Sequence, residues 1–236
     1  MRKLLGAVRA ACIDYNMIED GDRIAVGVSG GKDSLVLVNC LLQLKYYLKK
    51  SFEIHSIIID NNFPDTDYSG VIDYLDKSGV SHTLIKTNIY QGIFVDKQVK
   101  YPCSLCSRLR KGILSETAVN MNYNKIALGH HLDDAINTLF LNMIFEGRIA
   151  SFEPLSYLSR KKIYMIRPMI YLTESKIKSA AERYDIPVFK NNCPVSGKTK
   201  REYVDKLIKQ ISGTVKHFRM NMLSALKNKE QLSLWF

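Results

Sequence analysis

The residues best suited to chemistry begin with the string SGGKDS at positions 29–34. Its glycines allow the backbone to turn sharply and to approach a ligand closely, and a helix that starts here would aim its free N–H groups at an anion. Lys32 adds a full positive charge. A kinase-type phosphate loop would carry glycine at position 26 and Ser or Thr at position 33, where this chain has Val26 and Asp33. The string therefore predicts a phosphate-binding loop of a different type, in which Asp33 holds a metal ion or the loop itself.

A second polar string, ALGHHLDDAINT at positions 127–138, combines a glycine with two adjacent carboxylates. Gly129 would let a nucleotide lie close to the backbone. Asp133 and Asp134 open a helix, and their oxygens are ligands that Mg²⁺ prefers. On its own the Asp-Asp pair serves equally well as a helix cap. Beside a phosphate-binding loop, it predicts that Asp134 binds a metal ion or takes part in catalysis.

Five cysteines divide into two groups. Cys12 and Cys40 lie in apolar helical patterns and are expected to be small core residues. Cys103 and Cys106 form a C-x-x-C motif, and Cys193 follows much later in the chain. A zinc site would need a fourth ligand, and a thioredoxin-type redox motif would leave Cys193 without a role. Three thiolates without a fourth ligand fit a [4Fe–4S] cluster with one iron open to an exogenous ligand.

Alternating strand and helix patterns must position these residues. Such alternation predicts an α/β fold with a doubly wound, mostly parallel sheet and helices on both faces. Ligands of such sheets bind at the carboxyl ends of the strands, where the segments 29–34, 60–67 and 129–134 are expected. The expected strands are 23–28, 53–60, 82–87, 125–129 and 162–168, and the expected helices are 34–49, 66–79, 104–122, 133–145, 172–187, 199–211 and 214–226.

The positive charge of this chain is concentrated in its last third. The net charge is +11, but residues 1–158 hold 17 Lys and Arg against 17 Asp and Glu, whereas residues 159–236 hold 17 against 6. Such a segment is either a solvated surface or a binding site for a polyanion, most simply a nucleic acid. A membrane partner is not expected, because no apolar run reaches the ~18 residues that a bilayer span needs. The cytoplasm is the default location.

The strings SGGKDS and GHHLDDAINT resemble the pyrophosphatase loop, or PP-loop, and the second signature of the N-type ATP pyrophosphatases. These enzymes include GMP synthetase, tRNA-lysidine synthetase and the tRNA thiolases. The resemblance implies that ATP is cleaved between its α and β phosphates while the loop holds the pyrophosphate. Asn137 stands where the family form has glutamate. The implied ATP contacts are Ser29, Gly30, Gly31, Lys32, Asp33, Ser34, Asp60 and Gly129.

Three further strings, PCSLCSRLRKGIL, LGHHLDDAINTLFLNMIFEG and IRPM, extend the resemblance over nearly the whole chain. They look like the iron–sulfur-dependent tRNA thiolases of the TtcA type, the tRNA 2-thiocytidine synthetases. This resemblance implies that Cys103, Cys106 and Cys193 hold a [4Fe–4S] cluster. It departs from the family at Ser196, which replaces the second cysteine of the usual Cys-x-x-Cys-Gly-Ser context.

The expected reaction has two steps. ATP adenylates the C2 oxygen of a tRNA pyrimidine, with cytidine favoured, and hydrosulfide from the open iron then replaces that oxygen. Mg²⁺ would bind Asp33 and Asp134. The residues assigned to catalysis are Lys32, Asp33, Asp134 and Arg110, and those assigned to tRNA are Arg108, Arg167, Lys198, Lys200 and Arg201, with Lys206 and Lys209 as further candidates.

Several alternatives stay open from the sequence. Sulfur travels either on the open iron or as a cysteine persulfide. An amine as nucleophile would give a lysidine-synthetase-like enzyme, and a nucleic-acid-binding module would have no activity. The sulfur donor is a cysteine desulfurase or free sulfide, and a homodimer is one arrangement compatible with the resemblance. Residues 1–236 are expected to form a single PP-loop domain, with an N-terminal helix at 1–20 and basic helices at 195–236 as appendages.

Overall fold

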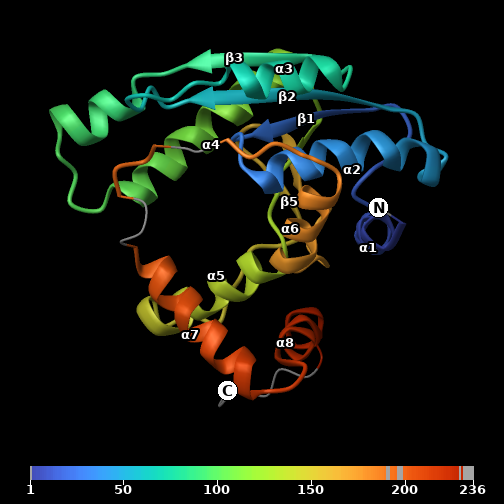
Figure 1. Cartoon of the computed structure of the whole chain (residues 1–236), viewed down its shortest axis with the longest axis vertical. Coiled ribbons are helices and arrows are strands. Elements are labelled where there is room, and N and C mark those ends of the chain that lie inside the picture. Colours follow the sequence, from blue (N-terminus) through green and yellow to red (C-terminus); the bar gives the residue numbers. More distant parts are fainter. Residues whose placement is uncertain (1, 190–191, 196–198, 229, 231–236) are drawn as a thin grey trace.

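The computed structural model describes residues 2–189, 192–195, 199–228 and 230. Within them, the sheet has six strands in the order β3-β2-β1-β4-β6-β5 (Figure 1). All neighbouring strands pair in parallel except β5 and β6, which form an antiparallel hairpin. The predicted doubly wound, mostly parallel sheet is thereby confirmed. The strands are β1 (Asp22–Val28), β2 (Phe52–Asp60), β3 (His82–Lys86), β4 (Lys125–Ala127), β5 (Leu155–Leu158) and β6 (Ile163–Ile166).

Apolar helix stripes cover both faces of the sheet. One face carries α1 (Arg2–Asp14), α2 (Lys32–Leu48), α3 (Ser69–Lys77) and α6 (Glu174–Arg183), and it buries the larger core. The other face carries α4 (Pro102–Asn120) and the π-helix η1 (Gln91–Asp96). Alternation along β2 divides its side chains between the two faces, so Ile58 joins the first core and Ile57 and Ile59 join the second.

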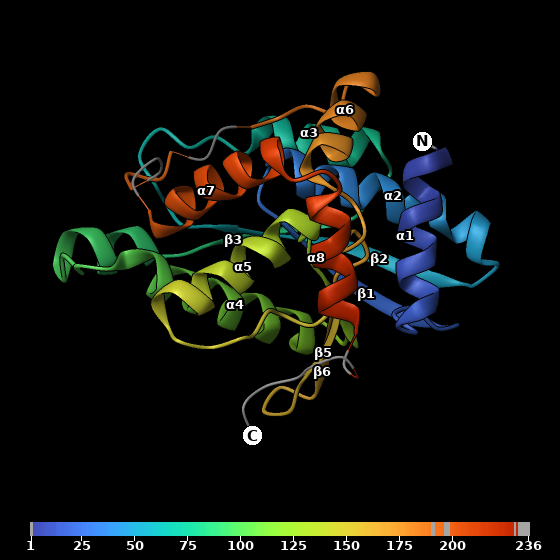
Figure 2. The ribbon, with the colours of Figure 1, turned by 90° about the horizontal axis from the view of Figure 1, so that it is seen from below.

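The C-terminal helices α7 (Lys200–Thr214) and α8 (Phe218–Lys227) pack against α5 (Leu132–Phe145) (Figure 2). Their contact buries Ile136, Val204 and Ile208 in a core separate from the two that flank the sheet. Thr199 begins α7: its backbone N–H donates to Glu202 Oε2 at 2.7 Å, and its hydroxyl accepts from the Glu202 N–H at 3.4 Å. The basic C-terminal helices are therefore held against α5.

Three features differ from the sequence-based expectations or were missed by them. The edge strand β5 was missed because its four residues, LSYL, have too few positions to show a period. The π-helix at Gln91–Asp96 was also missed. The N-terminal segment, predicted as an appended helix, contributes Leu5, Val8 and Met17 to the main core. Among the described residues, none of the helices combines the length and apolar character that crossing a membrane requires.

Candidate active site

The loop 29–34 joins β1 to α2 at the carboxyl edge of the sheet. Gly30 has φ +80°, a conformation that side chains rarely adopt. The Ser34 hydroxyl lies inside the turn, where it donates to the Gly31 carbonyl at 2.9 Å and accepts from the Ser29 N–H at 3.2 Å. These bonds hold the loop open around the N-terminus of α2, as an anion site requires.

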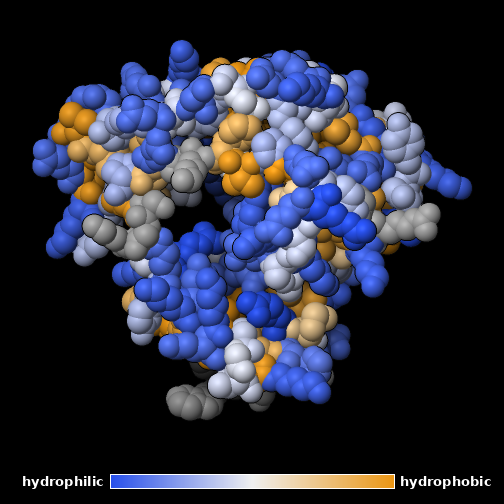
Figure 3. All heavy atoms as spheres, viewed as in Figure 1, coloured by the Kyte–Doolittle hydropathy of each residue, from blue (hydrophilic) through white to orange (hydrophobic). Residues whose placement is uncertain are grey.

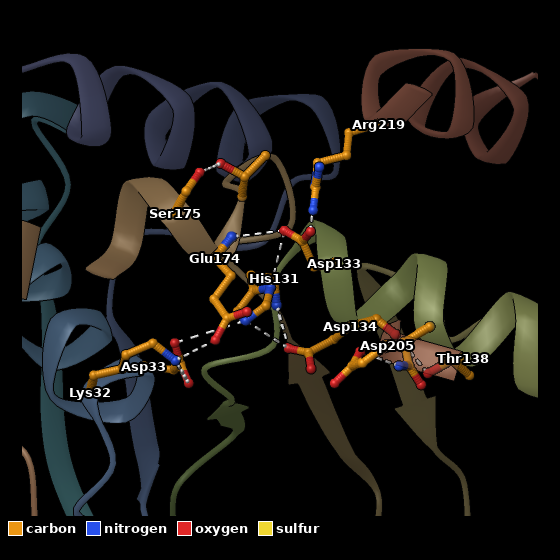
Figure 4. Close-up of polar contacts among 12 residues, drawn as sticks. Lys32, Asp33, His131, Asp133, Asp134, Thr138, Glu174, Ser175, Asp205 and Arg219 are labelled. Carbon is orange, nitrogen blue, oxygen red and sulfur yellow. Dashed lines mark hydrogen bonds and ion pairs between the residues drawn. The ribbon is translucent and has the colours of Figure 1, made fainter. Parts of the chain in front are cut away.

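Lys32 is charged and already paired. Its Nζ lies 3.0 Å from Glu174 Oε1 and 3.2 Å from Asp33 Oδ2 (Figure 4). Partial burial by itself would lower the pKa of Lys32, but the Glu174 hydrogen bond and the charge of Asp33 outweigh it and raise that pKa. Glu174 lies 142 positions from Lys32. Glu174 was not predicted as a site residue, because its contact with Lys32 exists only when the start of α6 lies beside the loop.

The carboxylates at the start of α5 are held by arginines from the C-terminal helices. Asp134 Oδ1 lies 2.6 Å from Arg201 Nη2. Asp133 Oδ1 lies 2.5 Å from Arg219 Nε (Figure 4). The Glu174 N–H also donates to Asp133 Oδ2 at 2.7 Å. Arg201, predicted to contact tRNA, is thus engaged within the chain, and Arg219 was missed.

His131 lies between the loop and these carboxylates (Figure 4). Its Nε2 is 3.4 Å from Asp134 Oδ2 and 3.8 Å from Asp33 Oδ1. Within the described part of the chain, the buried Asp33 Oδ1 and His131 Nδ1 have no hydrogen-bond partner. Buried oxygens without partners are costly, so Asp33 Oδ1 is an acceptor open to a cation or a ligand proton.

A cavity of about 290 Å³ lies next to the loop, at the carboxyl ends of β1, β2, β4 and β6. Ile57, Ile59 and Leu114 give it apolar walls, which suit a flat nucleobase. Arg110 and Lys111 of α4 supply charge at its lining. The predicted catalytic residue Arg110 therefore faces this cavity. Figure 3 shows the surface hollowed between the sheet and the α5–α7 layer, with hydrophilic residues along its lower side.

Arg167 and His130 form a polar wall of this cavity. Arg167 is only 5% exposed, lies over the Phe152 ring at 4.8 Å, and donates to the Glu153 carbonyl and to His130 Nδ1. Burial lowers the pKa of Arg167 to about 10 and that of His130 to about 4. Because Arg167 is buried, a tRNA group could contact it, as predicted, only by entering the cavity.

Two further predicted ATP contacts, Asp60 and Gly129, lie at strand ends as expected, and their contact with ATP stays a prediction. Among the described residues that line the cavity, β2 contributes Ile57 and Ile59 but not Asp60. Asp60 follows Ile59 on the opposite side of the strand and accepts a hydrogen bond from the Asn62 N–H at 2.7 Å. Gly129 packs against the loop itself: a Cβ there would lie 3.0 Å from the Asp33 carbonyl carbon. A glycine is therefore required at position 129, because the backbone of α2 leaves no room for a side chain.

The three predicted cluster ligands are electrostatically coupled. Burial raises the pKa of Cys103 and Cys106, and the nearby Cys193 thiol raises both further. The charge of Arg110, which also lines the cavity, lowers the pKa of Cys106 and so opposes this effect. Among the described residues, no three His, Cys, Asp or Glu side chains are close enough to hold a metal ion. The thiolate ligands of a [4Fe–4S] cluster bind different irons and stand farther apart than the ligands of a single ion, so the three thiols stay the predicted cluster ligands. Cys12 is buried as predicted, and burial raises its pKa to about 12.

The remaining predicted contacts lie apart from one another. Lys200 begins α7 with its Nζ 4.5 Å above the Phe145 ring, and Arg108 is exposed on α4. Lys198 lies outside the described residues, as does Ser196. Asn137 is buried and donates to Asp205 Oδ1 at 2.5 Å and to the Arg201 carbonyl at 3.1 Å. It therefore joins α5 to α7.

Known proteins resemble this chain along most of its length. A family model described as a PP-loop domain matches residues 7–211. The tRNA-cytidine(32) 2-sulfurtransferase of Pelobacter propionicus is 38% identical and covers 96% of this chain and 86% of its own. That of Geobacter sulfurreducens is 35% identical and covers 96% and 90%. The U34-tRNA thiolase NcsA from Methanococcus maripaludis, solved with its [4Fe-4S] cluster, has a TM-score of 0.79 at 21% identity, covers 95% of this chain and 76% of its own, and shares the fold.

Proposed function

We propose that this chain, which belongs to the PP-loop family together with the tRNA-cytidine(32) 2-sulfurtransferases, uses ATP to replace the C2 oxygen of a tRNA cytidine by sulfur. The observation that carries the proposal is the position of Arg110: it lines the cavity beside the phosphate-binding loop, and its charge acts on Cys106, which is itself coupled to Cys103 and Cys193. By relationship, position 32 of the tRNA is the expected target.

The loop prepares the first step. The C2 oxygen attacks the α-phosphorus of ATP, the bond to the β-phosphate breaks, and pyrophosphate leaves into the loop 29–34. Lys32 carries three N–H donors, so it can exchange the Glu174 carboxylate for pyrophosphate oxygens as negative charge develops. Asp33 and Asp134 would hold Mg²⁺, since hard oxygen ligands suit that ion.

The cysteines prepare the second step. Hydrosulfide attacks C2, and AMP leaves with the former C2 oxygen. A [4Fe–4S] cluster held by three thiolates would leave one iron available to bind that sulfur. Cys103, Cys106 and Cys193 fit this role by donor type and by their mutual electrostatic coupling. Arg110 lines the cavity, and its charge favours a Cys106 thiolate and would favour an anionic leaving group.

The partners follow from this reaction. tRNA is the substrate, and the basic residues Arg108, Arg167, Lys200 and Arg201 are proposed to contact it, Arg201 only by releasing Asp134. A cysteine desulfurase or free sulfide would supply the sulfur. The cytoplasm is where this substrate occurs. A homodimer stays a prediction, and sedimentation of the purified chain would test it.

Thiolation in vitro tests the proposal. Chain purified without oxygen is incubated with ATP, Mg²⁺, sulfide and tRNA, and the nucleosides are analysed by mass spectrometry. Wild type should form 2-thiocytidine, AMP and pyrophosphate. Lys32→Ala should lower the rate by about a hundredfold or more, because it removes a preorganised charge. Lys178→Ala, at an exposed position of α6, is the matched control and should retain activity.

Iron analysis separates the two cysteine groups. Cys106→Ala should lose iron and 2-thiocytidine formation together, whereas Cys12→Ala should keep both. Wild type without iron would contradict the cluster. An amine adduct in place of 2-thiocytidine would instead indicate a lysidine-synthetase-like reaction.

A further inference from the structure

A second cavity of about 400 Å³ lies between α4 and the β5–β6 hairpin, and its lining is strongly basic. Arg108 and Lys111 enter it from α4, and Arg160 and Lys161 enter it from the turn between the two strands. Lys111 also lines the cavity beside the PP-loop, so the two cavities adjoin. This second cavity, called the hairpin cavity below, is lined by none of the predicted ATP contacts among the described residues.

The charges of the hairpin cavity are available to a ligand. Arg160 is exposed, and the Lys161–Glu116 pair, at 3.3 Å, has side chains that are 41% and 62% exposed. Such exposed pairs contribute little to stability, so Lys161 can exchange Glu116 for a phosphate oxygen. Four cations around one hollow match a polyanion better than a single small anion.

Aromatic side chains distinguish the kind of polyanion. Tyr157 lines the hairpin cavity, and Tyr164 lies directly opposite it in the β5–β6 pairing. Their ring centroids are 4.8 Å apart, and they are 51% and 42% exposed. Exposed tyrosines beside a basic groove are a stacking platform for unpaired bases. The combination of cations and exposed aromatic rings therefore favours a single-stranded nucleic acid as the occupant.

We infer that the hairpin cavity binds the RNA strand next to the reacting base, with phosphates on Arg160, Lys161 and Lys111 and an unpaired base on Tyr157. The inference rests on the proposed function, because a base turned into the PP-loop cavity must carry its neighbouring nucleotides past Lys111. It adds a second RNA contact surface, on the face of α4 and the hairpin, to that of the C-terminal helices.

Salt-dependent tRNA binding tests the phosphate contacts. Arg160→Gln/Lys161→Gln should weaken binding and flatten the dependence of log K on log salt by about two, one for each phosphate contact removed. Between 50 and 200 mM salt, wild type should therefore lose roughly tenfold more affinity than this variant. Lys3→Gln/Arg9→Gln removes the same charge from the exposed face of α1, at a distance from the hairpin (Figure 2), and should bind like wild type.

Tyr157→Ala tests the stacking contact. It should weaken binding by about five- to a hundredfold and leave the salt slope unchanged. Wild-type salt dependence and affinity in Arg160→Gln/Lys161→Gln would overturn the inference. It would also be overturned if that variant bound tRNA normally but accepted sulfur only from free sulfide, since the surface would then dock a donor protein. If wild type binds and thiolates no tRNA, the proposed function itself fails.

Discussion

Replacing Asn137 by glutamate, the residue that the PP-loop signature carries there, should destabilise this protein. Asn137 is 1% exposed, and its amide donates to the Asp205 carboxylate at 2.5 Å and to the Arg201 carbonyl. A glutamate would place a second carboxylate against Asp205 and remove both donated bonds. The variant therefore strains the contact that joins α5 to α7.

The expected loss can be bounded from the geometry. Two carboxylates about 3 Å apart repel by about 5–6 kcal/mol at an effective dielectric constant of 20, so the new side chain takes up a proton instead. Keeping a glutamate with a reference pKa of about 4.3 protonated at pH 7 costs about 3.7 kcal/mol. Its folded-state pKa is raised, so this protonation penalty is absent below pH ~4.3 and grows by about 1.4 kcal/mol per pH unit above it, while the loss of the two bonds donated by the amide is independent of pH.

Urea unfolding followed by circular dichroism measures this penalty. Relative to wild type at the same pH, this protonation penalty should lower the free energy of unfolding of Asn137→Glu by about 1 kcal/mol at pH 5 and about 4 kcal/mol at pH 7, in addition to the pH-independent loss of the two bonds. Adding Asp205→Asn removes the repulsion and should restore most of the loss, as a double-mutant cycle would show. A penalty that is the same at pH 5 and pH 7, or below about 1 kcal/mol at pH 7, would refute the reasoning.

Three other outcomes are expected. Gly129→Ala should lower Tm and weaken ATP binding, since its Cβ would lie 3.0 Å from the loop backbone. Gly6→Ala, whose Cβ would have nothing within 4 Å, should do neither, and equal Tm values for the two variants would count against this packing. At pH 7.5 a thiol reagent should label exposed Cys103 quickly and Cys12, whose pKa is about 12, only after unfolding; rapid labelling of Cys12 in folded protein would contradict its burial. His130, with its pKa lowered to about 4, binds fewer protons in the folded than in the unfolded state, so the free energy of unfolding should fall by about 3 kcal/mol from pH 6.5 to pH 4. His130→Asn should remove this part of the pH dependence, and an unchanged pH dependence in the variant would disprove the assignment to His130.

Local signals predicted those parts of the site that are contiguous in the chain. The loop 29–34 was recognisable because its glycines, lysine and aspartate follow a strand and open a helix within six positions. The alternation of strands and helices likewise predicted the parallel sheet, since buried apolar residues recur with a different spacing in helices and in strands. The five predicted strands all appear, with shifts at their ends, because an element's core is more strongly marked than its boundary.

Contacts between distant segments escaped prediction. Glu174 was identified only as the start of a helix, and its role at Lys32 depends on how α6 docks beside α2. Arg201 was expected on an open RNA surface, but the packing of α7 on α5 directs it to Asp134. Asp60 was assigned to the nucleotide from its position at a strand end; its hydrogen bond from the Asn62 N–H could not be predicted, and its contact with ATP stays a prediction.

The amino-acid sequence alone determined the type of loop, the α/β fold and the set of thiols, because each depends on residues whose spacing sets their geometry locally. Tertiary structure alone decided which charges meet. It brought Glu174 to Lys32 and Arg219 to Asp133, and it placed the β5–β6 hairpin beside α4. These pairings arise from the burial of apolar helix faces, and that burial fixes the positions of polar side chains far apart in the chain.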